Sequence, residues 1–203
     1  MAEEAVPRGR ERRAEVARKL KDQGLKLIAA RGLHACRVEE ITRAVGVGKG
    51  TFFTHFATKD HFVAALVDHV LSDLVRRVRP VTLSPDGAEA LLAGVGAVHL
   101  RYFQLRPEAA ALLVQAVSLD PESPARTLVQ GRLAAHLSEV AGLIAPAGRE
   151  LGWPADRMDD LALMLLANSC GFFWFSRDLP ALQDTPVQLL ERLGRALAKG
   201  LSA

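Results

Sequence analysis

Cationic, hydroxyl and imidazole side chains are gathered in one short stretch of the chain, between residues 49 and 59. Lys49 and Lys59 provide ammonium groups, Thr51 and Thr54 provide hydroxyls, and His55 provides an imidazole. None of these groups is an obvious catalyst on its own. Presented together at the start of a helix, they suit contacts with phosphates and with the edges of nucleic-acid bases.

Two short helices and a tight turn are needed to position this stretch. Val38, Ile41 and Val45 recur at spacings of three and four residues, which is typical of one face of a helix. Gly46 interrupts the pattern and can adopt the positive φ that ends a helix, while Gly48 can act as the N-cap of the next one. The spacing predicts a helix-turn-helix.

The second of these helices begins at Lys49 and has an apolar and a polar face. Phe52 and Phe56 lie four residues apart on the inner face, which leaves the polar side chains on the outer face. The segment from Gly46 to Thr51 superficially resembles a phosphate loop, but it lacks the G-x4-G-K spacing and follows a helix rather than a strand. Neither G-x-S-x-G nor HExxH occurs. We therefore expect no enzyme: no catalytic residues, no metal site and no cofactor.

Residues from about 16 to 62 resemble the DNA-binding segment of TetR/AcrR-family transcriptional regulators. The positions that carry the resemblance without a gap are Val38, Ile41, Ala44, Gly46, Val47, Lys49, Gly50, Thr51, Phe52, Phe53, His55, Phe56 and Lys59. The resemblance implies a homodimer that binds double-stranded operator DNA, most often as a repressor. It also implies a small-molecule effector bound in the C-terminal domain.

Three positions depart from the family pattern. Arg37 stands where Ser or Thr is usual, so the first helix lacks a standard N-cap, and Gly48 replaces Ser with little loss. Phe53 replaces a common Tyr, so a hydroxyl that could bond a phosphate is absent. The residues that we expect to contact DNA are Arg37, Val38, Lys49, Gly50, Thr51, Phe53, Thr54, His55 and Lys59.

The charge distribution favours a polyanionic partner at the N-terminal end. Residues 1–60 contain 13 Lys/Arg and 8 Asp/Glu, whereas the remainder contains 13 and 15, although the net charge of the chain is only +3. A basic first quarter on an acidic body suits nucleic acid. Taken alone, this uneven charge distribution is explained equally well by a charged helix that is exposed to solvent and binds no nucleic acid.

The remaining composition predicts a cytoplasmic protein without a membrane segment. Residues 1–13 are charged and lack the apolar run of a signal peptide. The most apolar stretch, residues 161–175, is shorter than the roughly 18 residues that suggest a membrane span. Cys36 and Cys170 provide neither a disulfide framework nor a metal set, and we expect both to be small buried or half-buried residues.

Apolar spacing and Gly/Pro breaks predict an all-α fold of about nine helices. Beyond the two short helices within residues 37–56, their ranges are 13–31, 59–79, 84–105, 108–119, 125–151, 155–177 and 187–201. We expect three parts: a mobile arm over 1–12, a three-helix DNA-binding domain over 13–58, and an effector-binding and dimerisation domain over 59–203. Arg8, Arg10 and Arg12 in the arm, with Arg13 directly after it, could follow a minor groove or phosphates, or the arm could be a solubilising tail.

The helix over residues 155–177 is apolar nearly all round, so both of its sides must be buried. One side can pack on its own domain, and the other most simply meets the same helix of a second subunit. Together with the last helix it predicts a four-helix, two-fold interface. The expected interface residues are Phe172, Phe175, Leu190, Leu193, Leu197 and Leu201.

The family implies that the effector lies among the helices of the C-terminal domain. The polar and aromatic residues that we expect there are His99, Tyr102, Phe103, Gln115, His136, Asn168, Phe172 and Trp174. This set suits a hydrophobic or aromatic molecule held by one or two hydrogen bonds, and it contains no Arg or Lys that would favour a strongly anionic one. Two other classes of protein remain open: a helical carrier or enzyme with a vestigial helix-turn-helix, and a helical interaction module.

Overall fold

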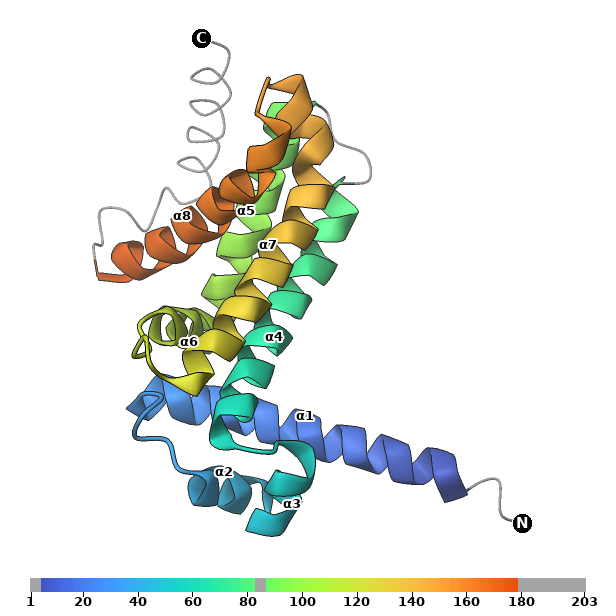
Figure 1. Cartoon of the computed structure of the whole chain (residues 1–203), viewed down its shortest axis with the longest axis vertical. Helices are drawn as coiled ribbons and strands as arrows, with labels where there is room; N and C mark the ends of the chain where they lie inside the picture. The colour runs from blue at the N-terminus through green and yellow to red at the C-terminus, as the bar shows by residue number, and fades with distance from the viewer. Residues whose placement is uncertain (1–4, 83–86, 179–203) are drawn as a thin grey trace. The chain divides into compact units, whose positions relative to one another are not determined.

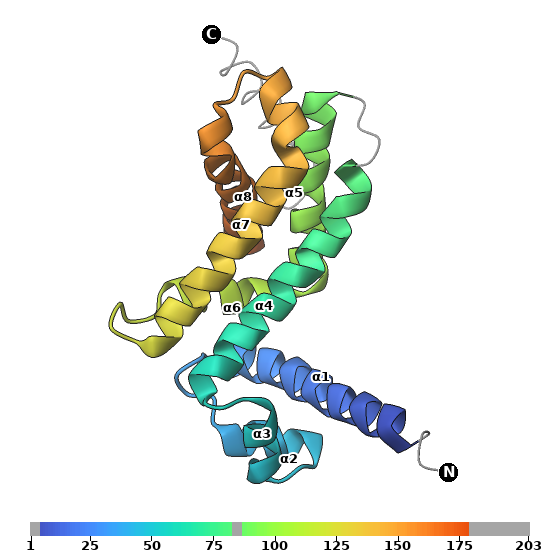
Figure 2. The same ribbon diagram turned by 45° about the vertical axis from the view of Figure 1, so that its right-hand side comes forward.

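The computed structural model describes residues 5–82 and 87–178, and these form helices only (Figures 1 and 2). The elements are α1 (Ala5–Arg31), α2 (Val38–Val45), α3 (Lys49–His55), α4 (Lys59–Val78), η1 (Arg79–Thr82), α5 (Ala88–Leu105), α6 (Pro107–Val117), α7 (Pro124–Glu150), η2 (Ala155–Arg157) and α8 (Met158–Asp178). The predicted all-α class is confirmed. The ninth predicted helix, over residues 187–201, lies outside the described residues.

The first helix begins eight residues before its predicted start at residue 13, so the segment expected to be an arm is helical from Ala5. Pro7 falls in the first turn, where a helix does not need the missing backbone N–H. Gly9 and the charged residues that follow it are exposed. Because residues 9–12 are all exposed, they give no apolar face from which an earlier start could be predicted.

Residue contacts divide the chain into two compact units. The N-terminal unit contains Met1–Asp68 and Ala111–Gln130, and the C-terminal unit contains His69–Ala110 and Gly131–Ala203. The predicted boundary after residue 58 falls at the start of α4, whereas the units divide that helix after Asp68. As a result α4, α6 and α7 each contribute residues to both units.

In the N-terminal unit, α2 and α3 lie on the same side of α1 (Figures 1 and 2). Side chains that are at most 1% exposed form the core between these helices: Leu20, Leu25, Ile28, Ile41 and Phe52. Gly24 permits a close approach of α4, because a Cβ there would lie 2.7 Å from Cε1 of Phe62.

In the C-terminal unit, α5 packs against α8, and the end of α4 and most of α7 complete the core (Figure 2). The fully or nearly fully buried aliphatic side chains include Val78, Leu91, Leu92, Val95, Val140, Ile144 and Leu161. The α7 helix continues through Pro146.

Among the described residues, no helix is both long and apolar enough to span a membrane. Cys36 is buried and Cys170 is half-buried, as predicted.

Candidate DNA-binding surface and effector region

The turn between α2 and α3 is fixed by one glycine in the left-handed region. Gly46 has φ +76° and ψ 32°, and its N–H donates to the carbonyl of Arg43 at 3.2 Å. The N–H of Val47 donates to the carbonyl of Thr42 at 3.0 Å. These two bonds form a Schellman motif, which satisfies the last carbonyls of α2. Gly48 follows in an extended conformation as the N-cap of α3, so the predicted turn is confirmed.

The two flanking helices are capped by side chains close in sequence. Arg37, at the N-cap of α2, makes no side-chain cap bond, but its N–H donates to the Glu40 carboxylate at 3.2 Å. This bond supplies half of a capping box without the usual Ser or Thr. At the start of α4, the N–H of His61 donates to the Thr58 hydroxyl at 3.2 Å, so Thr58 is the N-cap of this helix.

An aromatic cluster holds the inner face of α3. Phe52 is fully buried, and its ring centroid lies 5.4 Å from that of Phe56 and 5.0 Å from that of Phe62 on α4. The rings of Phe56 and Phe62 are 4.8 Å apart. A helix of seven residues is unstable by itself, so this cluster fixes which face of α3 is turned outward.

The outer face of α3 is polar and open. Lys49, Gly50 and Thr54 are exposed, and Thr51 and His55 are half-buried. A Cβ at Gly50 would meet nothing within 4 Å, so a ligand can approach the backbone there. The structure thus brings together on one helix six of the residues expected to contact DNA, including Phe53, which is 44% exposed although it is aromatic.

The three expected DNA contacts outside α3 lie in different environments. Arg37 is exposed. The Lys59 ammonium donates to the carbonyl of His34 at 3.3 Å, which ties it to the α1–α2 loop. Val38 differs from the rest, because its side chain is only 8% exposed and belongs to the core. Val38 can therefore affect DNA binding only by packing beneath the exposed residues.

Two interactions on this surface were not anticipated from sequence. The Lys49 ammonium bonds the Glu39 carboxylate at 2.5 Å, and this bond holds the pKa of Glu39 below its usual value. Both side chains are more than half exposed, so the ion pair contributes little to stability and can exchange for another anion. The Arg13 guanidinium on α1 donates to the carbonyl of Thr54 at 2.9 Å. Burial, helped by Arg13, lowers the pKa of His55, which favours the neutral imidazole.

Two histidines are buried together in the C-terminal unit. His99 on α5 is 0% exposed and His136 on α7 is 4% exposed, with 6.4 Å between their ring centroids. Within the described part of the chain, none of their four ring nitrogens has a hydrogen-bond partner. Burial lowers the pKa of His99 to about 3, an effect increased by its neighbour, and burial lowers the pKa of His136 to about 4. Both rings are therefore neutral at pH 7.

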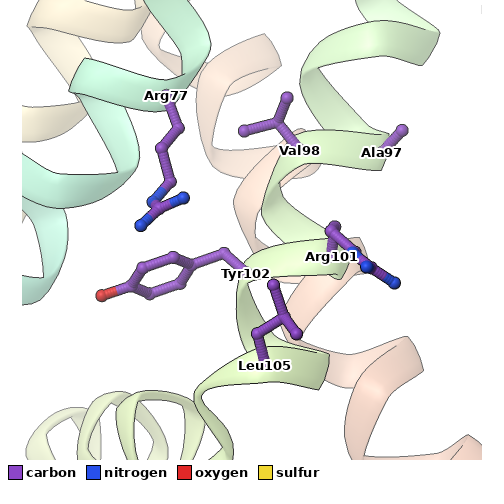
Figure 3. Close-up of a pocket in the computed structure, with 6 residues that line it drawn as sticks. All are labelled: Arg77, Ala97, Val98, Arg101, Tyr102 and Leu105. Carbon is purple, nitrogen blue, oxygen red and sulfur yellow. The ribbon is translucent and has the colours of Figure 1, made fainter.

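A groove of about 310 Å³ lies between α4 and α5 in the same unit (Figure 3). Its lining residues are Arg77, Ala97, Val98, Arg101, Tyr102 and Leu105. Arg77 reaches in from α4, with its Cζ 5.4 Å from the centroid of the Tyr102 ring, and its Nε lies 3.4 Å from the Asp73 carboxylate. Burial, followed by the charge of Asp73, raises the pKa of Tyr102 to about 12.

Comparison with known proteins assigns the helix-turn-helix to a family. The family model described as bacterial regulatory proteins, tetR family, matches residues 20–66. The helix-turn-helix segment therefore belongs to the tetR family. The HTH-type transcriptional repressor Rv3405c of Mycobacterium tuberculosis is 38% identical over 71 residues, 35% of this chain and 36% of the relative. The repressor DhaR of Mycobacterium sp. strain GP1 is 33% identical over 66 residues, 32% and 33% of the two chains. The alignments with these relatives span about a third of their length.

The likeness in fold to solved structures extends over nearly the whole chain. The fatty acid degradation regulator FadR from Bacillus halodurans aligns at 18% identity with a TM-score of 0.72, covering 92% of this chain and 96% of that one. FadR from Bacillus subtilis, solved in complex with stearoyl-CoA, aligns at 15% identity with a TM-score of 0.69, covering 91% and 97%. The family and the named relatives are transcriptional regulators rather than enzymes, which confirms that prediction for this chain.

In the C-terminal unit, three of the aromatic residues expected around the effector are connected through neighbouring rings. The ring centroids of Tyr102 and Phe103 are 5.9 Å apart, and Phe103 lies 6.4 Å from Phe173 on α8. Phe173 in turn lies 5.9 Å from Trp174. Phe173 was missed by the sequence analysis, although it stands between the expected Phe172 and Trp174. Phe173 is only 8% exposed, so it lies on the buried side of this part of α8.

Two expected effector residues do not join this region. Gln115 on α6 belongs to the N-terminal unit, where its amide oxygen accepts from the N–H of Leu33 at 2.6 Å and its amide nitrogen lies 3.5 Å from the carbonyl of Ile28. Asn168 was expected to be buried, but it is exposed and donates to the carbonyl of Met164 at 2.7 Å. Polar residues on an apolar helix need not face the interior when a backbone carbonyl of the same helix can satisfy them.

The outer side of α8 carries apolar residues that no other described part of the chain covers. Phe175 is 70% exposed and Leu163 is 49% exposed, while Phe172 is half-buried. The sequence analysis expected this helix to be buried on both sides. The remaining expected interface residues lie outside the described part of the chain: Leu190, Leu193, Leu197 and Leu201.

Proposed function

We propose that this TetR-family chain is a cytoplasmic, homodimeric repressor that binds operator DNA and is released by a small effector. The observation that carries the proposal is the outward polar face of α3, on which Gly50 and Thr51 follow Lys49 without obstruction. Two relatives are named as repressors, which supports the sign of regulation.

On DNA, Lys49 would leave Glu39 and bind a phosphate, since a flexible ammonium needs no fixed base geometry. Gly50 and Thr51 would approach base edges, where a missing side chain and a short hydroxyl permit close contact. Thr54, Phe53 and the neutral His55 would lie at the edge of the same contact. Further phosphate contacts would come from two residues outside α3: Arg37 and Lys59.

The proposed dimer would use the uncovered side of α8. Exposed aromatic and aliphatic side chains such as Phe175 and Leu163 are of the type that a subunit interface buries. A two-fold dimer would present two α3 helices to an operator with dyad symmetry, about 34–36 Å apart or a little more. Leu190 and Leu197 would extend the interface.

The effector would bind in the C-terminal unit. His99 and His136 are its most informative residues, because buried ring nitrogens without partners are uncommon and a ligand can supply the missing bonds. The Bacillus subtilis neighbour was solved with stearoyl-CoA, which supports a small molecule with a large apolar part. The ligand would shift the population toward a conformation that fits DNA poorly, and a change from 1:99 to 99:1 requires about 5.5 kcal/mol of differential affinity. The α4 helix, which belongs to both units, is the natural link.

A binding assay with DNA from the protein's own upstream region tests the proposal. We expect Lys49→Ala to weaken binding to all sequences and to reduce the slope of log K against log salt by about one. The matched control is Lys26→Ala, which removes one exposed ammonium from α1 in the same unit. No binding by the unmodified protein to any upstream fragment would refute the proposal, and an unchanged slope would remove Lys49 from the phosphate contacts.

A further inference from the structure

The groove between α4 and α5 combines positive charge with an apolar surface. Arg77 shares the single Asp73 carboxylate with Arg76, whose guanidinium lies 2.6 Å from it. Arg101 is exposed and makes no ion pair with any residue that the structure describes. The groove is therefore lined by two guanidinium groups, and the one carboxylate that pairs with Arg77 is also shared with Arg76, so positive charge is in excess.

The surface between these charges is hydrocarbon. Figure 3 shows Val98 and Leu105 projecting between the Arg77 and Arg101 side chains, above and below the level of Tyr102. Leu105 is 59% exposed, an unusual position for a large aliphatic side chain. The Tyr102 ring is only 3% exposed, so it forms a rigid wall rather than a mobile cover.

We propose that this groove binds a small amphipathic anion, with its carboxylate or phosphate held by Arg101 and Arg77 and its apolar part against Val98 and Leu105. Guanidinium groups bind such headgroups through paired N–H donors, and the apolar part removes the exposed hydrocarbon from water. At about 310 Å³ the groove is at the lower end of ligand pockets, about 300–1,000 Å³. This reverses the sequence-based expectation that an anionic ligand is disfavoured, because Arg77 and Arg101 were not among the residues then considered.

Whether the groove binds an anion does not depend on any effect on DNA. Whether that anion is the effector rests on the proposed function and is tested separately. Tyr102 is the only tyrosine in the chain, so biosynthetic replacement of tyrosine by 3-fluorotyrosine places one fluorine at the wall of the groove. A single ¹⁹F resonance then reports directly on occupancy of this groove in the full-length protein.

The experiment titrates the fluorinated protein with octanoate, octyl phosphate and octanol. We expect both anions to shift the Tyr102 resonance saturably, with octanol at least tenfold weaker, since a tenfold difference corresponds to about 1.4 kcal/mol for the headgroup contact. The two anions distinguish a carboxylate from a phosphate site. Equal binding of octanol and octanoate would overturn the proposal, as would the absence of a saturable shift with either anion.

Matched arginine variants locate the headgroup. Arg101→Gln should weaken octanoate binding about tenfold and Arg101→Lys less, whereas Arg149→Gln removes an exposed arginine from α7 in the same unit and should leave binding unchanged. Equal losses in Arg101→Gln and Arg149→Gln would refute a headgroup contact. Operator affinity measured with the same ligands separates the two proposals. If a ligand binds the groove but does not release the operator, the groove remains a binding site but is not the effector site. If the unliganded protein does not bind the operator at all, only the proposed function is rejected.

Discussion

Replacing Gln115 by leucine should destabilise the protein through a single unsatisfied backbone group. The Gln115 amide oxygen accepts the N–H of Leu33, just beyond the end of α1, at 2.6 Å. The second bond, to the carbonyl of Ile28, is at the 3.5 Å limit of hydrogen bonding and contributes little. Leucine has nearly the same volume as glutamine, so the substitution removes the acceptor without opening a large cavity.

The expected loss follows from the burial of the partner. The side chain of Leu33 is 6% exposed, and a buried N–H deprived of its acceptor costs about 1–3 kcal/mol. For a chain of this length each kcal/mol lowers Tm by about 2–4 °C. Gln130→Leu is the control, because this glutamine is exposed in the same unit and its replacement should change the free energy of unfolding by less than about 0.5 kcal/mol.

Urea denaturation of the three proteins measures the difference, and hydrogen exchange at the Leu33 amide tests its cause. Exchange at this amide should be slow in the unmodified protein and in Gln130→Leu, and markedly faster in Gln115→Leu. If Gln115→Leu unfolds at the same urea concentration and protects Leu33 equally well, the assigned bond does not stabilise the end of α1 and the reasoning is wrong.

Two further predictions concern the buried histidines and the glycines of α1. Because burial lowers the pKa of His99 to about 3 and of His136 to about 4, their neutral forms stabilise the fold fully above pH 6.5, and this contribution is lost as pH falls toward 4 and 3. The free energy of unfolding should decrease below pH 6.5 with a slope approaching about 2.7 kcal/mol per pH unit for two protons, and a double replacement by leucine should remove most of that slope. Gly24→Ala should cost about 1–3 kcal/mol because its Cβ would overlap an aromatic ring of α4. Gly9→Ala, with nothing within 4 Å, should be neutral or stabilising by up to about 1 kcal/mol by the same denaturation measurement, and equal effects of the two changes would contradict the assigned close approach.

The parts that sequence predicted well depend on residues near one another in the chain. The positive φ of Gly46, the N-cap at Thr58 and the inward aromatic pair of α3 all follow from spacings of a few residues. The start of α1 was predicted too late because residues 9–12, just before the predicted start, are all exposed and leave no apolar pattern.

The parts that sequence could not give depend on which helices meet. Gln115 and His136 both read as polar residues on apolar helices, yet one caps α1 and the other pairs with a second histidine. Arg77 and Arg101 are 24 positions apart on different helices, and only their tertiary arrangement places both around Tyr102. The type of a residue was visible in each case, but its partner was not.

The aromatic cluster beneath α3 separates folding from recognition within a single seven-residue helix. Stability resides in the inward rings of Phe52 and Phe56, whereas the outward positions, Gly50 and Thr54 among them, pack against little. Substitutions at such exposed positions usually change stability by no more than about 0.5 kcal/mol. The outward residues can therefore diverge in evolution, or be randomised in a library to select a new operator, while the scaffold that presents them stays intact.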